Sequence, residues 1–327
     1  MAASGWTASA ENRMLGDLTI LTFHRVLPDA RASAYAFPSL AVPLSVFTSL
    51  IDELRQRYEL VTVAEGWRRL SDTSAAVSKP LVALSFDDGY ADNLLLAAPA
   101  LERAGVRGTF YVVTGLVGTD GEFWYDVAAR RYAAASGRQL LALLQSALGT
   151  AVSRLDPRAG LPGWMQWLKS LSPSERETAI AALPDPGRQG DHAELDRVMT
   201  VEQLRRLAAA GHEVGSHTLT HPLLPQLDDP KLAHELGASR EMLQDWLQSP
   251  VTGFCYPNGD HDDRVVDAVR HAGYGHACTT LHGRNAPAAD PYRLRRVDMH
   301  PGRLTTASGR FEASSTRATV SLAHRRA

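Results

Sequence analysis

Cysteine is scarce in this sequence, because Cys255 and Cys278 are the only two among 327 residues. So few thiols exclude the disulfide framework of a small secreted domain. One bond between the two would still be allowed. We expect two buried free thiols instead.

The sequence also lacks long apolar runs and a strong charge of either sign. No uninterrupted apolar stretch is long enough to cross a bilayer, so no transmembrane segment is expected. Residues 1–16 do not show the basic start and apolar stretch of a secretory signal peptide, which predicts a cytoplasmic location unless the chain is exported by another route. The formal net charge of −2 gives no reason to expect a nucleic acid as partner.

What the sequence does contain is an alternation of short apolar segments and helical patterns. The apolar spacing within residues 44–58 predicts a helix, and Thr200 and Gln203 form the capping box of another. Strands are expected at residues 18–23, 59–63, 81–86, 109–113, 213–216, 252–256 and 274–278. Such alternation predicts an α/β fold with parallel strands and crossover helices, and 327 residues fit one α/β barrel.

The alternation is interrupted between about residues 118 and 196. This segment is rich in Ala and Leu, contains several prolines, and predicts short helices inserted between two barrel units. Its tryptophans, Trp124, Trp164 and Trp167, could line a groove, but we favour a small helical core that they fill. Residues 303–327 are rich in Ser, Thr and Arg and predict a loose C-terminal tail. With a flexible N-terminus at residues 1–16, the main domain is expected at residues 17–302.

Two adjacent carboxylates follow the expected strand 81–86. Asp87 and Asp88 stand directly before Gly89, at the carboxyl edge of the sheet, where α/β folds build their sites. Without a cation, the pKa of one of two close carboxylates would rise sharply, whereas a metal would take one of them as a ligand. Either acid could instead cap the helix expected near Ala91, so this pair alone leaves both roles open.

Two histidines four residues apart follow the expected strand 213–216. A helical turn begun at Ser216 or Thr218 would bring His217 and His221 to the same side, and Pro222 disfavours a regular helix beyond them. The chain has 12 histidines, most of them expected at the surface or in the core, so this pair alone does not establish a metal site. Two imidazoles and one carboxylate, however, leave a coordination position open on a metal, as catalytic sites do. That combination suggests a metal-activated water and therefore hydrolysis.

Three segments together resemble the NodB-homology polysaccharide deacetylases (carbohydrate esterase family 4). They are Phe86-Asp87-Asp88-Gly89, the His217 and His221 pair, and Tyr256-Pro257-Asn258-Gly259. The likeness runs from about residue 19 to residue 297. The third segment, taken alone, also fits a plain β-turn. The resemblance implies a distorted (β/α) barrel of about seven parallel strands with a helical insertion.

The resemblance also implies a role for each matching residue. It gives Asp87 as the general base, and Asp88, His217 and His221 as the metal ligands. The backbone amide of Asn258 would stabilise the oxyanion, and Tyr256 and Pro257 would contact the substrate.

The sequence departs from the usual family pattern in two places. No Asp-Trp motif follows the third motif, and the third motif has no Arg to orient the base. Arg296 is the favoured substitute for that Arg, although it could equally belong to a solvated basic cluster with Arg293 and Arg295.

Two histidines are candidates for the general acid. His24, after the first expected strand, resembles the early histidine motif of a permuted subgroup, the exopolysaccharide and poly-N-acetylglucosamine deacetylases. His300 comes just after Val297, at the end of a further expected strand beyond those above, where other family members carry their acid. We favour His24, and a histidine at a strand end that only bonds to backbone remains the alternative for it.

The predicted function is the metal-dependent removal of N-acetyl groups from N-acetylhexosamine units of a polysaccharide or oligosaccharide. Zinc is the expected metal from its ligand set, and cobalt or nickel could serve. A deacylase acting on O-acetyl or formyl sugar groups is one alternative. A carbohydrate-binding protein without catalysis is the other.

Overall fold

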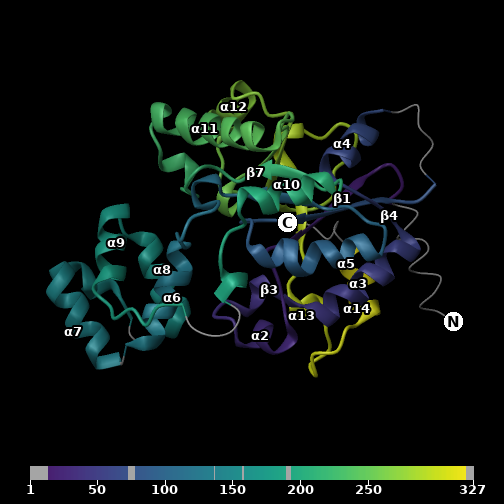
Figure 1. The fold of residues 1–327 in the computed structure, drawn as a ribbon. Coiled ribbons are helices and arrows are strands. Elements are labelled where there is room, and N and C mark those ends of the chain that lie inside the picture. Colours follow the sequence, from purple (N-terminus) through teal and green to yellow (C-terminus); the bar gives the residue numbers. More distant parts are fainter. Residues whose placement is uncertain (1–13, 73–77, 136, 157, 189–192, 322–327) are drawn as a thin grey trace. The chain divides into compact units, whose positions relative to one another are not determined.

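Seven parallel strands form a closed barrel at the centre of the protein (Figure 1). The computed structural model describes residues 14–72, 78–135, 137–156, 158–188 and 193–321. Around the barrel the strands follow the order β5 (Leu81–Phe86), β6 (Thr109–Val112), β7 (Glu213–Ser216), β8 (Gly253–Cys255), β9 (His276–His282), β10 (Leu294–Asp298) and β1 (Leu18–Phe23). The barrel closes where β1 pairs with β5, in register from Leu18 opposite Leu81 to Phe23 opposite Phe86. The predicted barrel of about seven parallel strands is confirmed.

Three short strands lie outside this closed ring. β4 (Glu59–Val61) pairs with the first half of β5, and β2 (Arg25–Leu27) pairs with β3 (Ala41–Pro43) in a separate two-stranded sheet. The expected strand bounds agree with the structure to within a few residues, except that β9 starts and ends later than expected.

Helices connect the strands around the barrel, and the last two follow the final strand β10. They are α2 (Asp29–Ala34), α3 (Leu44–Arg57), α4 (Val63–Ser71), α5 (Ala98–Arg103), α10 (Val201–Ala209), α11 (Asp229–Leu247), α12 (Asp263–His271), α13 (Pro301–Leu304) and α14 (Ala313–Ser321). The capping box at the start of α10 is present, since the Thr200 side chain accepts from the Gln203 amide and the Gln203 side chain accepts from the Thr200 amide. Among the described residues, no helix is long and apolar enough to cross a membrane.

The two faces of β5 explain how the strand carries both core and site. Phe86 packs against Phe47 of α3 and stacks on Phe110, so this face of the strand lies under the helices. Leu81 and Ala83 belong to a buried cluster that also contains residues of β1, β8, β9 and β10. Because side chains alternate along a strand, residues 81, 83, 85 and 87 share the face that points into the barrel. The alternation therefore brings Asp87 to the inside of the barrel at its carboxyl end.

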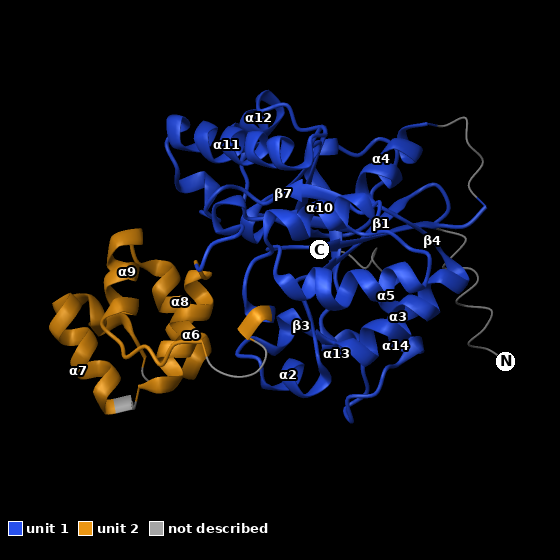
Figure 2. Ribbon diagram, in the orientation of Figure 1, with its two compact units in different colours: residues 1–120, 195–327 blue, residues 121–194 orange. Residues whose placement is uncertain are grey.

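Residues 121–194 form a compact unit of their own, coloured orange in Figure 2. It contains α6 (Trp124–Ala134), α7 (Gly137–Leu148), α8 (Gly160–Ser170) and α9 (Pro173–Ala181). Trp164 and Trp167 are buried inside it, and the indole N–H of Trp164 donates to the carbonyl of Ala128. Both tryptophans thus fill a helical core. The unit lies in the chain between β6 and β7, so it replaces a short barrel connection.

The predicted loose tail at residues 303–327 is wrong for its described part. Helix α14 occupies Ala313–Ser321, Thr316 and Val320 are fully buried, and Arg317 forms an ion pair with Glu53 of α3. Only two side chains, four residues apart, point inward, so the sequence shows no repeating apolar pattern there. Residues 322–327 lie outside the described residues.

The predicted flexible N-terminus at residues 1–16 falls mostly outside the described residues too. Of this segment the structure describes residues 14–16, and Met14 is fully buried. The prediction of a flexible segment is therefore wrong at Met14.

Candidate metal and catalytic site

The strand β5 ends in a sharp turn that separates the two adjacent carboxylates. The amide of Asp87 still continues the sheet, donating to the Phe23 carbonyl at 3.0 Å. Asp88 and Gly89 then both adopt left-handed backbone conformations, with φ of 76° and 82°. A Cβ at Gly89 would lie 2.9 Å from a methyl of Val112, so glycine is required there by space as well as by φ. Both carboxylates are buried, but the turn directs them to different partners.

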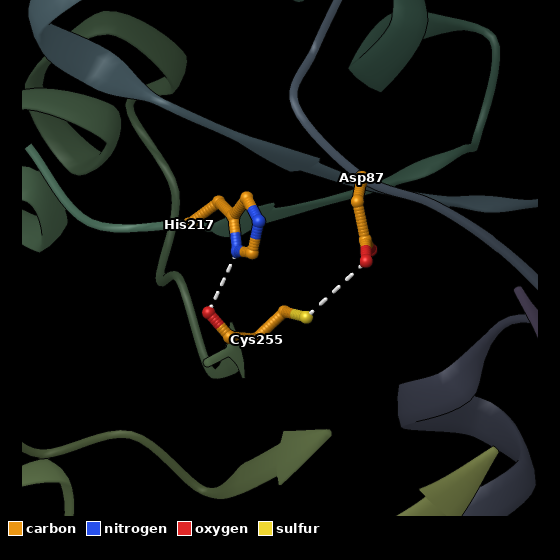
Figure 3. Close-up of side chains that lie close together, drawn as sticks. All are labelled: Asp87, His217 and Cys255. Carbon is orange, nitrogen blue, oxygen red and sulfur yellow. Dashed lines mark hydrogen bonds between the residues drawn. The ribbon is translucent and has the colours of Figure 1, made fainter. Parts of the chain in front are cut away.

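His217 is held in one tautomer by a backbone carbonyl. Its amide donates to the Val112 carbonyl, which keeps the residue at the end of β7. Its Nδ1 lies 2.8 Å from the carbonyl oxygen of Cys255 (Figure 3), and that atom must carry the proton because a carbonyl can only accept. The Nε2 atom is then unprotonated, and its lone pair can bind a metal. Burial lowers the pKa of His217 to about 4, so the ring is neutral at neutral pH.

His221 is brought to the same point by a tight loop. Thr218 and His221 have φ of 71° and 60°, and the His221 amide donates to Thr218 Oγ1. Glu235 of α11 fixes the loop from outside, since its carboxylate accepts from the amides of Leu219 and Thr220 and from the Thr220 hydroxyl. The two imidazole rings lie with centroids 4.9 Å apart.

Asp88, His217 and His221 have the geometry of a metal-binding group. Asp88 Oδ1 lies 3.7 Å from Nε2 of His217 and 3.7 Å from Nε2 of His221. Ligand atoms about 2.1 Å from a tetrahedral metal lie roughly 3.4 Å apart, so small side-chain movements would bring the three onto one ion. The second nitrogen of His217 already donates to a backbone carbonyl, as ligating histidines usually do. The residues therefore fit a divalent metal with at least one position left open.

Asp87 has a different environment, dominated by Arg296 of β10. Arg296 Nη1 donates to Oδ1 at 2.8 Å and Nη2 donates to Oδ2 at 2.7 Å, and both residues are buried. Burial alone would raise the pKa of Asp87, but the charge and hydrogen bonds of Arg296 outweigh it and hold that pKa well below its usual range. Arg296 is fixed in turn by the Thr279 carbonyl. Asp87 is thus a carboxylate with a set orientation, and the basic-cluster alternative for Arg296 does not fit this burial.

The two candidate acid histidines differ in their neighbours. His24 follows β1 directly, and Phe23 pairs with Phe86, so His24 lies across from Asp87 in the sheet register. His24 is half-buried, and it is among the groups whose charge lowers the pKa of Asp87. The His300 ring lies over Gly302 at the start of α13.

The loop after β8 contains the third motif, and it corrects one prediction. The Tyr256 side chain is fully buried and its hydroxyl donates to the Tyr292 carbonyl, so this side chain does not face a substrate; Pro257 is buried as well. The predicted substrate contacts of Tyr256 and Pro257 therefore do not fit the side-chain positions. Asn258, by contrast, is exposed with φ of 55°, and its carbonyl accepts from Thr280.

The sequence did not predict the site contacts of two residues, Glu235 and Cys255. Glu235 lies in the middle of a long helix, and nothing in its local pattern marks it as a partner of residues 219 and 220. Cys255 was expected to be a buried free thiol, which the structure confirms, but its contacts with Asp87 and His217 were not expected.

Comparison with known proteins agrees with this geometry. A family model described as polysaccharide deacetylase matches residues 74–147 and 177–277, together more than half of the chain. The chain belongs to the polysaccharide deacetylase family. The match includes Asp87, Asp88, His217, His221 and Cys255, and so most of the site.

Individual deacetylase relatives are distant. YxkH of Bacillus subtilis is 27% identical over 113 residues, which are 35% of this chain and 40% of YxkH. The peptidoglycan-N-acetylglucosamine deacetylase of Bacillus cereus is 28% identical over 71 residues, 22% of this chain and 33% of that protein. The chain thus spans less than half the length of these curated relatives.

Solved structures of deacetylases share the fold at low sequence identity. The deacetylase PplD of Streptococcus pyogenes, solved with acetate, has a TM-score of 0.59 at 19% identity, covering 88% of this chain and 94% of PplD. IcaB from Ammonifex degensii has a TM-score of 0.58 at 20% identity, covering 92% of this chain and 97% of IcaB.

Proposed function

We propose that this chain is a metal-dependent hydrolase that removes N-acetyl groups from N-acetylhexosamine units of a polysaccharide or oligosaccharide. The observation that carries the proposal is that the two adjacent carboxylates at the end of β5 have different partners. Asp88 converges with His217 and His221 on one point, while Asp87, next in the chain, is oriented separately by Arg296. A non-catalytic carbohydrate-binding protein would not need a second, oriented carboxylate beside a three-ligand set.

A divalent metal held by Asp88, His217 and His221 would polarise the acyl carbonyl and lower the pKa of a water bound beside it. Two imidazoles and one carboxylate favour zinc, and cobalt or nickel would bind the same ligands. Asp87, which is ionised at neutral pH, accepts the proton that the attacking water loses. Arg296 keeps both carboxylate oxygens in place during that transfer.

Two further roles, the general acid and the donor to the oxyanion, belong to His24 and Asn258. His24, across the sheet from Asp87, donates a proton to the departing amine. The backbone amide of Asn258 supplies a hydrogen bond to the oxyanion, as backbone amides do in acyl-transfer sites. The polysaccharide deacetylase family match, and a relative that acts on peptidoglycan N-acetylglucosamine, support an N-acetylated glycan as substrate.

Acetate release from N-acetylglucosamine oligomers tests the proposal directly. Zinc-loaded protein should release acetate, chelation should abolish the activity, and added zinc should restore it. Asp87→Asn should lower kcat by at least about a hundredfold, because general base catalysis contributes about that much. Equal activity of the variant and the original protein would contradict the mechanism.

A panel of acylated sugars separates the remaining alternatives. Faster release from O-acetyl or formyl sugars than from N-acetyl sugars would assign a different acyl specificity to the same site. Glycan binding by calorimetry without turnover of any sugar, in zinc-loaded protein, would overturn the hydrolase and leave a binding protein.

A further inference from the structure

Cys255 contacts both halves of the site from the end of β8. Its Sγ lies 3.6 Å from Asp87 Oδ2, within reach of a hydrogen bond from a thiol, and its carbonyl oxygen accepts from His217 Nδ1 at 2.8 Å (Figure 3). The residue is fully buried. In the family pattern this part of the third motif supplies an Arg to the base, and here it supplies a thiol.

We propose that Cys255 is a positioning residue that ties the carboxylate of Asp87 to the imidazole of His217. The inference rests on the proposed function, in which Asp87 is the general base and His217 is a metal ligand of the same reaction. It adds a thiol donor that neither the family match nor the sequence motifs assign.

The donors around Asp87 show what the thiol adds. Both bonds from Arg296 arrive from β10, one on each carboxylate oxygen. The thiol arrives from β8 and adds a third donor, on Oδ2. Because the carbonyl of the same residue accepts from His217, Cys255 is in contact with the proposed base and with a proposed metal ligand at once.

The chemistry of the site favours a thiol at this position. Burial raises the pKa of the Cys255 thiol well above its ordinary value, so it remains an S–H donor. Arg296 already balances the charge of Asp87, and a neutral donor adds a hydrogen bond without a second buried cation. The Tyr256 carbonyl, at 3.8 Å from Sγ, is a competing acceptor. The carboxylate is nearer and charged, and charged acceptors form the stronger bond.

Cys278 is a matched control on the neighbouring strand. It is the register partner of Cys255 in β9, it is equally buried, and its Sγ lies 3.3 Å from the Tyr111 hydroxyl. The same substitution at the two positions therefore removes the same atoms from the same layer of the barrel. Only one of the two thiols contacts Asp87.

Infrared spectroscopy of the S–H stretch tests the contact itself, in metal-free protein and independently of activity. Only two thiols are present, so Cys278→Ala leaves the Cys255 band alone in the spectrum. We expect this band to move to higher frequency when Asp87→Asn is added, because an amide is a weaker acceptor than a carboxylate. An unchanged band would mean that the thiol donates to Tyr256 instead, and would overturn the inference even if the protein is an active deacetylase.

Kinetics test the positioning role. Cys255→Ala should lower kcat by about three- to tenfold with KM changed less than about twofold, because a thiol is a weak donor and the loss of about 0.7–1.4 kcal/mol is that of one ordinary hydrogen bond. Cys278→Ala should leave both constants near those of the original protein. Equal kcat values for the two variants would overturn the inference, whereas an absence of acetate release from all three proteins would overturn the proposed function.

Discussion

Left-handed backbone concentrates at the residues of the candidate site. Of the five described non-glycine residues with positive φ, four are Asp88, Thr218, His221 and Asn258, and the fifth, Gln248, ends α11. Asp and Asn tolerate this conformation, but a β-branched Thr rarely adopts it. Thr218 is held by two hydrogen bonds: its amide donates to Ser216 Oγ, and its hydroxyl oxygen accepts from the His221 amide. Strain that surrounding structure maintains is typical of functional sites, and here it is found at two of the three proposed metal ligands, Asp88 and His221.

The choice between His24 and His300 can be decided by substituting each in turn. His24→Asn should lower kcat on N-acetylglucosamine oligomers by about a hundredfold, because a general acid near Asp87 would be lost. His300→Asn serves as its control and should change kcat by less than about threefold. The reverse ranking in a steady-state assay would transfer the acid role to His300.

At the scale of elements, the loop between β7 and α11 depends on a single carboxylate. Glu235 accepts three hydrogen bonds from residues 219 and 220, between the two histidine ligands. Glu235→Ala should weaken zinc binding by about ten- to a hundredfold, the usual effect of removing a partner behind a ligand. Competition with a chromophoric chelator measures that affinity.

Two further variants make the Glu235 experiment specific. Glu235→Gln should restore most of the affinity, since an amide oxygen can accept from both backbone amides while its NH₂ donates to the Thr220 hydroxyl. Glu241→Ala alters an exposed glutamate on the same helix and should leave zinc binding unchanged. Normal zinc affinity in Glu235→Ala would show that the loop keeps its shape without the carboxylate.

The sequence predicted those features that are local in the chain. Asp87 and Asp88 are adjacent and His217 and His221 are four residues apart, so each motif is visible within one short segment. The contact of Arg296 with Asp87 joins residues 209 apart, and that of Cys255 with Asp87 joins residues 168 apart. Both depend on closure of the barrel, which no local pattern encodes. Arg296 could be named only by resemblance, and α14 was missed because it buries so few side chains.

At the scale of the whole molecule, the barrel interior changes character from one end to the other. Toward the amino ends of β1 and β5 it is filled by an apolar cluster that includes Leu18, Ile20, Leu81 and Ala83. Its carboxyl end holds a buried ion pair and a buried neutral imidazole. A charged or titratable group in such a place makes the stability of the entire fold depend on pH, because the unfolded chain titrates with ordinary pKa values.

His217 gives this dependence a definite sign in metal-free protein. Burial lowers its folded pKa to about 4, from an ordinary value of 6.5. Between these values the unfolded chain binds a proton that the folded protein does not, so the free energy of unfolding falls as the pH falls. The loss from this one group should be about 2 kcal/mol between about pH 7 and pH 5. Asp92, whose pKa burial raises to about 6, acts in the opposite direction, so the contribution of His217 must be isolated by substitution.

Urea unfolding of chelator-treated protein at both pH values measures the effect, with His217→Gln as the comparison. Glutamine can still donate to the Cys255 carbonyl but does not titrate, so the variant should lose about 2 kcal/mol less stability on acidification than the original protein. Zinc added at pH 7 should raise the stability of the original protein and not that of the variant, since a ligand that binds only the folded state stabilises it. Parallel pH dependence in the two proteins would mean that the His217 ring takes up a proton in the folded state, and that burial does not keep it in the neutral form that a metal requires.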